Sequence, residues 1–259
     1  KWVATRVLLA RAYLYKGDNA KADEVSSDLL KQAEGTSFKL FSNSEYKSAW
    51  SQQTGSEYFY VIYNSAEEIS DSKEFLSYLM HRSGYDDLSI STDYMDLLLE
   101  DENDVRIKII ERYAKNRDYL QKYVSPDYKV SNMPILRISE AYLIAAEAAV
   151  KLGNKENAAG YLNAIVSRAN PEKSVDAADV TLERVLIERR KELVGEGHRL
   201  YDAMRNNQTI QRKGASHSSA LLTDETKSFN WDFYKILMPI PRGEMNVNPN
   251  MVQNPGYGN

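Results

Sequence analysis

The chain has 259 residues and a formal net charge of −4, and 42% of its residues are hydrophobic. This hydrophobic fraction supports a packed core and argues against a wholly disordered chain. The mild acidity argues against a nucleic-acid-binding protein, which normally carries a basic surface. The absence of cysteine excludes disulfides and thiolate metal sites. The sequence contains no run of about 18 apolar residues, the length that a transmembrane helix needs.

Residues 1–33 are predicted to form two helices joined by a tight turn. Apolar side chains recur at helical spacing in the first helix, which ends at Lys16, Gly17 and Asp18. The second helix covers residues 20–32, so the pair forms an αα-hairpin. Because the helical pattern is already established at the first residue, we expect a domain of a longer protein whose targeting segment lies upstream.

Residues 36–130 differ from the rest in composition, because they contain eleven of the 18 tyrosines. Residues 56–65 are rich in β-forming residues and predict a short strand. Residues 73–91 predict a short helix or strand followed by a turn at Gly84. Residues 92–127 begin as a helix and continue as a mixture of strand and loop. The segment therefore interrupts the helical pattern with irregular structure.

A second helical hairpin is predicted from residues 138–152 and 157–169. Small residues occupy matching positions in the two hairpins: Ala10 matches Ala146, Gly17 matches Gly153, and Ala22 matches Ala158. Small residues at these positions let two antiparallel helices approach closely, and the layout is that of tetratricopeptide repeats. The alternative is an ordinary pair of packed helices.

The last part of the chain is predicted to change from helix to loop. Residues 181–207 predict a helix, an interruption at Gly195 or Gly197, and a further helix. Residues 208–235 are polar and predict a loop. The proline-rich residues 237–259 are not expected to form regular structure. Their apolar side chains predict that this tail packs against the body of the protein.

Three carboxylates near the predicted helix interruption are candidates for chemistry. Glu188, Glu192 and Glu196 are four residues apart and would form one row on a helix, with Arg189 and Arg199 in reach. A carboxylate pair could be a glycosidase site. Neighbouring positions on one helix rarely place two carboxyl groups on opposite sides of a sugar ring, however. We therefore interpret the row as an ion-pair ladder that fixes the helix to its neighbours.

Metal and nucleotide motifs are not found in the sequence. His81, His198 and His217 are far apart and do not form a metal-binding HExxH pair. Residues 101–106 (DENDVR) resemble the start of a calcium loop, but Arg106 replaces the required glycine. No phosphate-binding, dinucleotide-binding or nucleophile-elbow motif occurs. The sequence therefore predicts no cofactor, no metal and no catalytic residue.

The aromatic residues of the irregular segment indicate a carbohydrate-binding surface. A flat aromatic ring can stack on the C–H face of a sugar, while neighbouring polar groups bond to the hydroxyls. Such groups surround the predicted turn at Gly84. The predicted ligand-binding residues are Trp50, Tyr78, His81, Arg82, Tyr85, Asp86 and Asp87. The alternative is that these tyrosines pack between helices.

Several segments, in order along the chain, carry the motifs of one known family. They are ATRVLLARAYLYKGDNAKA (4–22), MPILRISEAYLIAAEAAVKLGN (133–154), AAGYLNAIVSRAN (158–170), ERRKELVGEGHRLYDAMRNN (188–207) and MPIPRGEMNVNPNMVQNPGY (238–257). Together they resemble the SusD/RagB family of nutrient-binding cell-surface lipoproteins of the Bacteroidota. One departure is Val166, where the family usually has arginine.

The resemblance implies a mostly α fold. Tetratricopeptide-like helical hairpins would form a right-handed superhelical scaffold, with irregular loops and a little β structure. A single domain would cover residues 1–259. It would comprise helical repeats at about 1–33 and 134–207, a variable ligand-binding insertion at about 36–130, and the tail at about 237–259. The charged residues of the shared motifs would be scaffold.

The resemblance also implies a non-enzymatic role. Such a protein captures an oligosaccharide or other nutrient at the cell surface and delivers it to a SusC-like TonB-dependent transporter of the outer membrane. A lipid anchor on an N-terminal cysteine, which this chain lacks, would be its only membrane contact. Two alternatives remain open: a tetratricopeptide-like scaffold that binds peptide or protein partners, and, with less support, a helical glycoside hydrolase.

Overall fold

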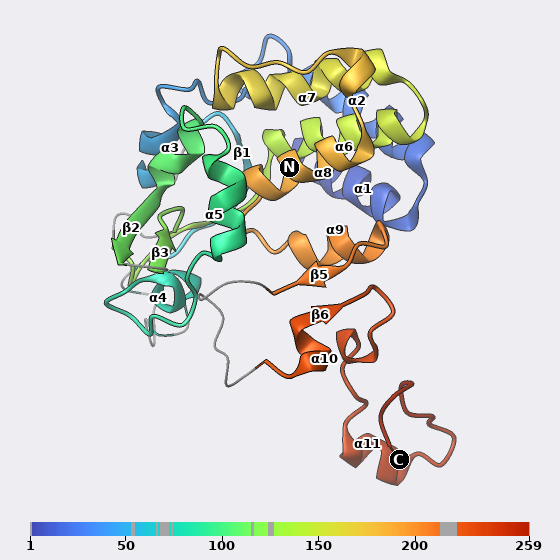
Figure 1. Cartoon of the computed structure of the whole chain (residues 1–259). Coiled ribbons are helices and arrows are strands. Elements are labelled where there is room, and N and C mark those ends of the chain that lie inside the picture. Colours follow the sequence, from blue (N-terminus) through green and yellow to red (C-terminus); the bar gives the residue numbers. More distant parts are fainter. Residues whose placement is uncertain are drawn as a thin grey trace. The chain divides into compact units, whose positions relative to one another are not determined.

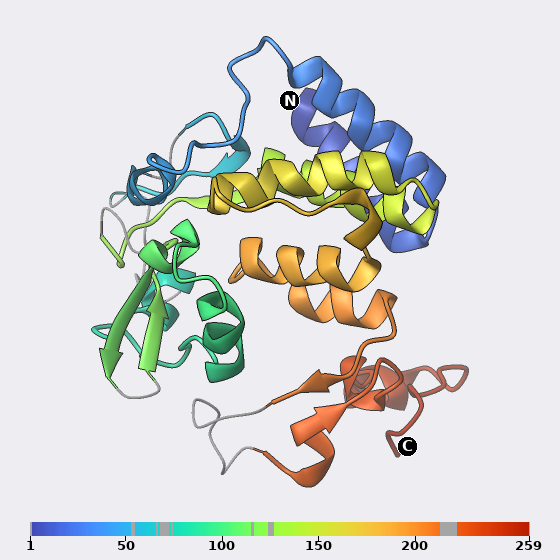
Figure 2. The same ribbon diagram turned by 45° about the horizontal axis from the view of Figure 1, so that its top comes forward.

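The computed structural model describes residues 2–52, 55–65, 67, 73, 75–114, 117–123, 127–212 and 222–258. These residues divide into two compact units, the first reaching to Arg199 and the second formed by residues 200–212 and 222–258. Figures 1 and 2 show that helices dominate the first unit. The described part of the chain is mostly helical with short two-stranded sheets, which confirms the predicted fold class. The single domain stays a prediction.

Both predicted helical hairpins are present in the first unit. Their helices are α1 (Trp2–Lys16), α2 (Asn19–Ala33), α6 (Ile138–Lys151) and α7 (Lys155–Ala169). The helix α6 packs against both α2 and α7, so the four helices form one continuous stack (Figure 2). The four small residues that align between the hairpins, Ala10, Ala22, Ala146 and Ala158, are completely buried.

The turns of the two hairpins have the same backbone geometry. Gly17 and Gly153 both have a left-handed backbone, with φ of +82° and +79°, which glycine adopts without the cost of a Cβ atom. The following residues, Asp18 and Asn154, cap the second helix of each pair through their side chains. The same hydrogen bond closes each turn: Asp18 N–H to Tyr13 C=O and Asn154 N–H to Ala149 C=O, both 2.9 Å.

The predicted interruption near Gly195 is also present. The helix α8 (Leu182–Glu192) ends before Gly195 and Gly197, both of which have positive φ. A short 3-10 turn, η3 (Ala177–Asp179), precedes α8, and α9 (Arg199–Arg205) follows the interruption. Glu196 therefore lies in a turn, and the prediction of one helical row of three carboxylates is wrong for this residue.

The irregular segment contains short helices and strands packed around an aromatic core. Its elements are α3 (Tyr46–Gln52), β1 (Tyr58–Ile62), α4 (Leu76–Met80), α5 (Thr92–Leu99), η2 (Val105–Ile109), β2 (Ile110–Ala114) and β3 (Arg117–Leu120). The strands β2 and β3 form an antiparallel pair. The strand β1 pairs antiparallel with β4 (Met133–Arg137), which runs directly into α6. The pairing therefore joins the irregular segment to the second hairpin.

The second unit has more regular structure than the sequence predicts. It contains β5 (Ile210–Gln211), α10 (Asp224–Lys227), β6 (Ser228–Phe229), η5 (Tyr234–Ile236) and α11 (Arg242–Val247). The predictions of an unbroken loop at 208–235 and of no regular structure at 237–259 are wrong. Pro241 is the N-cap of α11, where its missing N–H group is not needed for a helical hydrogen bond.

Candidate ligand-binding site

A buried network of charged residues connects the irregular segment to the helices. Its carboxylates are Glu57, Asp104, Glu188, Glu192 and Glu196, the last with a nearly buried side chain, and its cations are Arg106, Lys122, Arg137 and Arg168. The central contacts involve Glu57, whose two oxygens lie 2.7 Å from Arg137 and 2.6 Å from Arg168. Arg168 also lies 2.6 Å from Glu192, and Arg106 lies 2.6 Å from Glu188.

The cations of the network keep its carboxylates ionised. Burial alone would raise the pKa of Glu196, but Arg137 and Lys122 outweigh it and lower this pKa to about 2. Burial opposes ionisation of Glu192 as well, yet Arg168 and Arg137 hold its pKa well below the usual range. A general acid needs the opposite shift at neutral pH. These carboxylates therefore fit the predicted ion-pair role better than a role in glycoside hydrolysis.

The ladder has different partners from those that the sequence suggests. Arg189 lies 3.6 Å from Glu147 of α6. Arg184 of α8 pairs with Glu188 at i,i+4 spacing, but the other cations that face the three carboxylates come from distant parts of the chain, namely η2, β4, α7 and Lys122. Sequence spacing along one helix could not reveal these distant contacts.

Trp50 packs against the buried charged network and does not line a ligand surface. Its side chain is completely buried, with the ammonium of Lys122 at 4.6 Å and the guanidinium of Arg137 at 4.9 Å from its ring centre. The rings of Tyr58 and Tyr123 also pack against the indole, with ring centres 5.7 and 6.3 Å away. The prediction that Trp50 stacks on a ligand is corrected, because its ring has no surface exposed to solvent.

The other predicted site residues lie together on one loop, which we call the aromatic loop (residues 78–87). The loop begins in α4 and folds back on itself, because the amide of Tyr85 donates to the carbonyl of Tyr78 at 2.9 Å. Gly84 is required at the turn, since a Cβ atom there would lie 2.0 Å from the carbonyl oxygen of Tyr78. The loop conformation therefore follows from a close backbone approach.

The rings of the aromatic loop form a continuous surface. Tyr78 and Tyr85 meet edge to face with ring centres 5.1 Å apart. His81 stacks on Tyr128, with centres 4.2 Å apart and planes 10° apart. Tyr85 is half exposed, so part of this aromatic cluster is open to solvent. Burial lowers the pKa of His81, and Arg82 adds to this shift, which favours a neutral imidazole, whose Nδ1 accepts a hydrogen bond from the amide of Ser83 at 3.1 Å.

Polar groups surround these rings. The guanidinium of Arg82 lies 4.7 Å from the ring centre of Tyr113 and 3.3 Å from a carboxylate oxygen of Glu111. Asp86 accepts a hydrogen bond from the hydroxyl of Tyr119 and lies 2.7 Å from Arg117. Asp87 is exposed and lies beside them in the chain. Flat rings next to fixed donors and acceptors are the chemistry that a sugar requires.

Sequence reasoning missed Tyr113 and Tyr128, which complete this surface. Tyr113 is 56% exposed on β2, and Tyr128 stacks on His81 from a loop more than forty positions further along the chain. The abundance of tyrosine in the segment is the signal that could have included them. His198 is buried in the first unit, and His217 lies outside the described residues.

Comparisons with known proteins agree with this architecture. The sequence profile of the SusD family matches residues 109–257. The starch-binding protein SusD of Bacteroides thetaiotaomicron is 31% identical over 137 residues, which are 50% of this chain and 22% of that protein. A SusD superfamily protein of Bacteroides vulgatus is 43% identical with a TM-score of 0.91, and the match covers 99% of this chain and 60% of that one.

A surface glycan-binding protein A of Bacteroides uniformis is also similar, with 26% identity and a TM-score of 0.68. That match covers 96% of this chain and 60% of the other. The matched residues thus span about a fifth of the length of the curated relative and about three fifths of the length of these solved structures.

Proposed function

The chain belongs to the SusD family, and from this premise we propose that it is part of a non-enzymatic glycan-binding protein whose ligand stacks on the aromatic loop. The observation that supports this proposal most directly is the exposed ring of Tyr85 next to His81, Arg82 and Asp87. The relatives support the ligand class, since one is named a starch-binding protein and another a surface glycan-binding protein.

The aromatic loop would bind its ligand in two ways. Tyr85 and the outer rings Tyr113 and Tyr128 would stack on the C–H faces of successive sugar units. Arg82 and Asp87 would bond to the hydroxyl groups, while Tyr78 and Asp86 would keep the loop in place through their contacts with Tyr85 and Tyr119. Stacking with a few hydrogen bonds gives modest affinity, with a dissociation constant in the micromolar to millimolar range, about −8 to −4 kcal/mol.

We further propose that the bound oligosaccharide is handed to a SusC-like TonB-dependent transporter of the outer membrane. Weak binding suits a protein that must release its cargo. The proposal includes a lipid anchor at the cell surface, supplied by a part of the protein outside this chain. No helix within the described residues is long and apolar enough to cross a lipid bilayer.

Isothermal titration of the full-length protein with plant, host and microbial oligosaccharides tests the proposal. We expect one class of oligosaccharide to bind, and Tyr85→Ala to weaken that binding by up to about tenfold, since a stacking contact on an aromatic ring is worth roughly 0.5–1.5 kcal/mol. Tyr201→Ala is the matched control, because this tyrosine is equally exposed but lies in the second unit.

Three results would contradict parts of this proposal. Binding of no glycan by the folded full-length protein would contradict the ligand class. Equal loss in the Tyr85 and Tyr201 variants would contradict the assignment of the aromatic loop. Release of the aglycone from a chromogenic glycoside would contradict the non-enzymatic role.

A further inference from the structure

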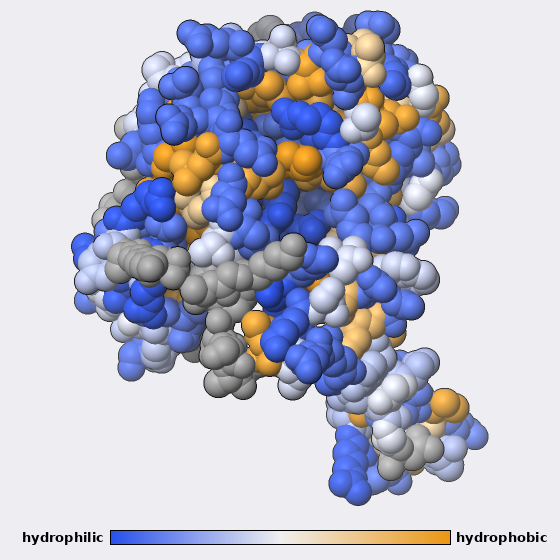
Figure 3. All heavy atoms as spheres, viewed as in Figure 1, coloured by the Kyte–Doolittle hydropathy of each residue, from blue (hydrophilic) through white to orange (hydrophobic). Residues whose placement is uncertain are grey.

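A second pocket of the first unit lies between the end of α5, the end of α7 and the helix α8, and it shares no described residue with the aromatic loop. Its volume is about 290 Å³, close to the lower limit of small-molecule pockets. Arg106, Glu188 and Lys191 contribute to its polar wall, and Val166 and Ile187 to its apolar wall. Figure 3 shows hydrophobic residues between α7 and α8 on a largely hydrophilic face.

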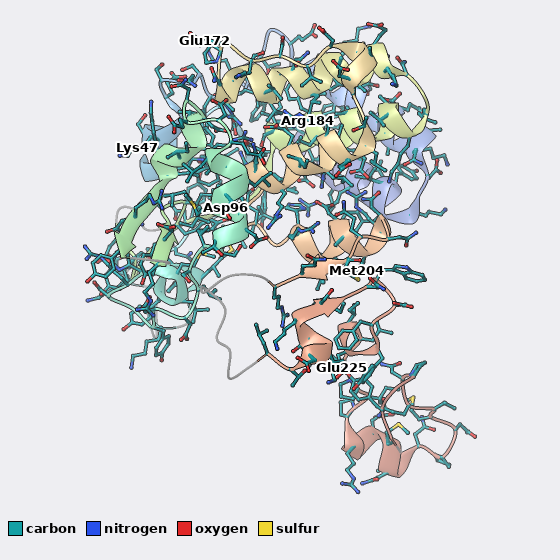
Figure 4. The ribbon with its side chains drawn as sticks, in the orientation of Figure 1. Lys47, Asp96, Glu172, Arg184, Met204 and Glu225 are labelled. Carbon is teal, nitrogen blue, oxygen red and sulfur yellow. The ribbon has the colours of Figure 1, made fainter. Side chains whose placement is uncertain are left out.

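Most of the buried charge in this pocket is already paired. Arg106 lies 2.6 Å from Asp104 and 2.6 Å from Glu188. The second oxygen of Glu188 lies 2.8 Å from Arg184, which Figure 4 labels on α8. Each of these two carboxylates, Asp104 and Glu188, is therefore paired with at least one of the two guanidinium groups, those of Arg106 and Arg184.

Lys191 is the exception on this wall. Lys191 as a whole is only 8% exposed. Within the described ranges, its ammonium group forms no ion pair and no hydrogen bond. Burial lowers the pKa of Lys191, and Arg106 adds to this shift, although Glu188 and Asp104 oppose it. The ammonium of Lys191 thus lines the pocket without a counter-charge of its own, so the pocket has a site for one further negative charge.

The groups around Lys191 are suited to hydroxyls. Asp101 is fixed by Asn170, whose amide donates to both carboxylate oxygens at 3.0 and 2.9 Å. Glu100 and Ser174 are exposed at the rim of the pocket. Carboxylates accept strong hydrogen bonds from hydroxyl groups, whereas a second anion would be repelled by them. The pocket therefore favours a ligand with one negative charge and several hydroxyls.

We propose that this pocket binds an acidic monosaccharide, a hexuronate, whose carboxylate pairs with Lys191 and whose hydroxyl groups donate to Asp101 and Glu100. The apolar wall of Val166 and Ile187 contacts the C–H face of the sugar ring. This pocket and the aromatic loop share no residue, so uronate binding in the pocket can be tested separately from oligosaccharide binding at the loop.

Isothermal titration of the protein with sodium glucuronate and sodium galacturonate tests this site, with glucose and acetate as reference ligands. We expect a uronate to bind more tightly than either reference. Lys191→Met should weaken this binding by about tenfold or more, because it removes a charge-assisted contact and keeps the apolar stem. Lys191→Arg should largely retain binding, since it keeps the charge.

Two matched variants separate this site from other effects. Lys108→Met removes the same charge from an exposed position outside the pocket and should leave uronate binding unchanged. Tyr85→Ala should also leave it unchanged, although it weakens oligosaccharide binding at the aromatic loop. Circular dichroism checks that each variant is folded.

The unsubstituted protein gives a reading that does not depend on any variant. Saturating uronate should slow reductive methylation of Lys191 and not that of Lys108, as followed by mass spectrometry of peptides. The proposal is overturned if neither uronate binds, if glucose or acetate binds as tightly as the uronates, or if Lys191 is methylated at the same rate with and without uronate.

Discussion

Glu192 shows how strongly single residues of the buried network depend on one another. Its carboxylate is completely buried, and Arg168, Arg137 and Arg106 lie 2.6, 3.1 and 3.6 Å from it. Removing this group leaves three buried guanidinium groups with one counter-charge fewer, which costs more than the pair itself contributes. Glu192 therefore stabilises the fold by balancing the charge of the buried arginines around it.

Glu192→Ala should lower the free energy of unfolding by about 3–5 kcal/mol, because it removes a carboxylate shared by Arg168 and Arg137 and leaves an excess of buried positive charge. Urea denaturation measures the change. Glu24→Ala, at an exposed position of α2, is the control and should change it by less than about 0.5 kcal/mol. Weaker glycan binding in a Glu192→Ala protein of unchanged stability would contradict the scaffold role.

Gly84→Ala should disturb the aromatic loop without unfolding the unit. The added Cβ would lie 2.0 Å from the carbonyl oxygen of Tyr78, so the backbone of the loop must move. We expect oligosaccharide affinity to fall by about tenfold, measured by isothermal titration, because the ring of Tyr85 shifts with the loop. Unaltered affinity would show that the loop does not bind the glycan.

Single residues of the aromatic loop could be predicted from the sequence only in part. A glycine turn flanked by tyrosine, histidine, arginine and aspartate is a local pattern, and the structure brings these residues together. The burial of Trp50 is not local, because it depends on Lys122 and Arg137 from distant segments. Composition identifies aromatic residues, but it does not say which of their faces remain open.

At the scale of elements, local signals were sufficient for the helical hairpins. Glycine followed by a capping aspartate or asparagine determines where each hairpin turns, and the structure repeats this geometry at Gly17 and Gly153. The short strands β5 and β6 and the helix α11 gave no comparable signal, because two to six residues are too few to show a period. These elements depend on pairing and capping contacts instead.

Gly160→Ala should stabilise α7. Gly160 is in the helix interior, and a Cβ atom there would meet nothing within 4 Å. Alanine loses less backbone entropy than glycine on folding, so the free energy of unfolding should rise by about 0.5–1 kcal/mol. Urea denaturation measures the gain, and a loss of stability would show that the space beside this position is occupied.

At the scale of the whole molecule, the buried carboxylates predict a dependence of stability on pH. The pKa of Glu196 falls from its usual value of 4.5 to about 2 on folding, and those of Glu188 and Glu192 are also lowered. A lowered pKa in the folded state stabilises the fold above the unfolded pKa. This contribution is therefore present above about pH 4.5 and is lost as the pH falls towards 2.

The measurement is the free energy of unfolding between pH 2 and 7. We expect it to fall steeply below about pH 4.5 in the unsubstituted protein, and to fall less steeply in Glu196→Gln, which has one fewer carboxylate to protonate. Identical slopes for the two proteins would contradict the assignment of the shift to Glu196.

The pairing of Glu57, Arg106 and Lys122 with residues of the helical frame also limits how this protein can be redesigned. These three residues belong to the irregular segment, yet their partners lie on β4, α7, α8 and the turn that follows. Exchanging the whole segment for one without these charges would leave Arg137 and Arg168 without Glu57, and Glu188 without Arg106. A change of ligand preference is better attempted by grafting residues 81–87 alone, with the anchoring charges left in place.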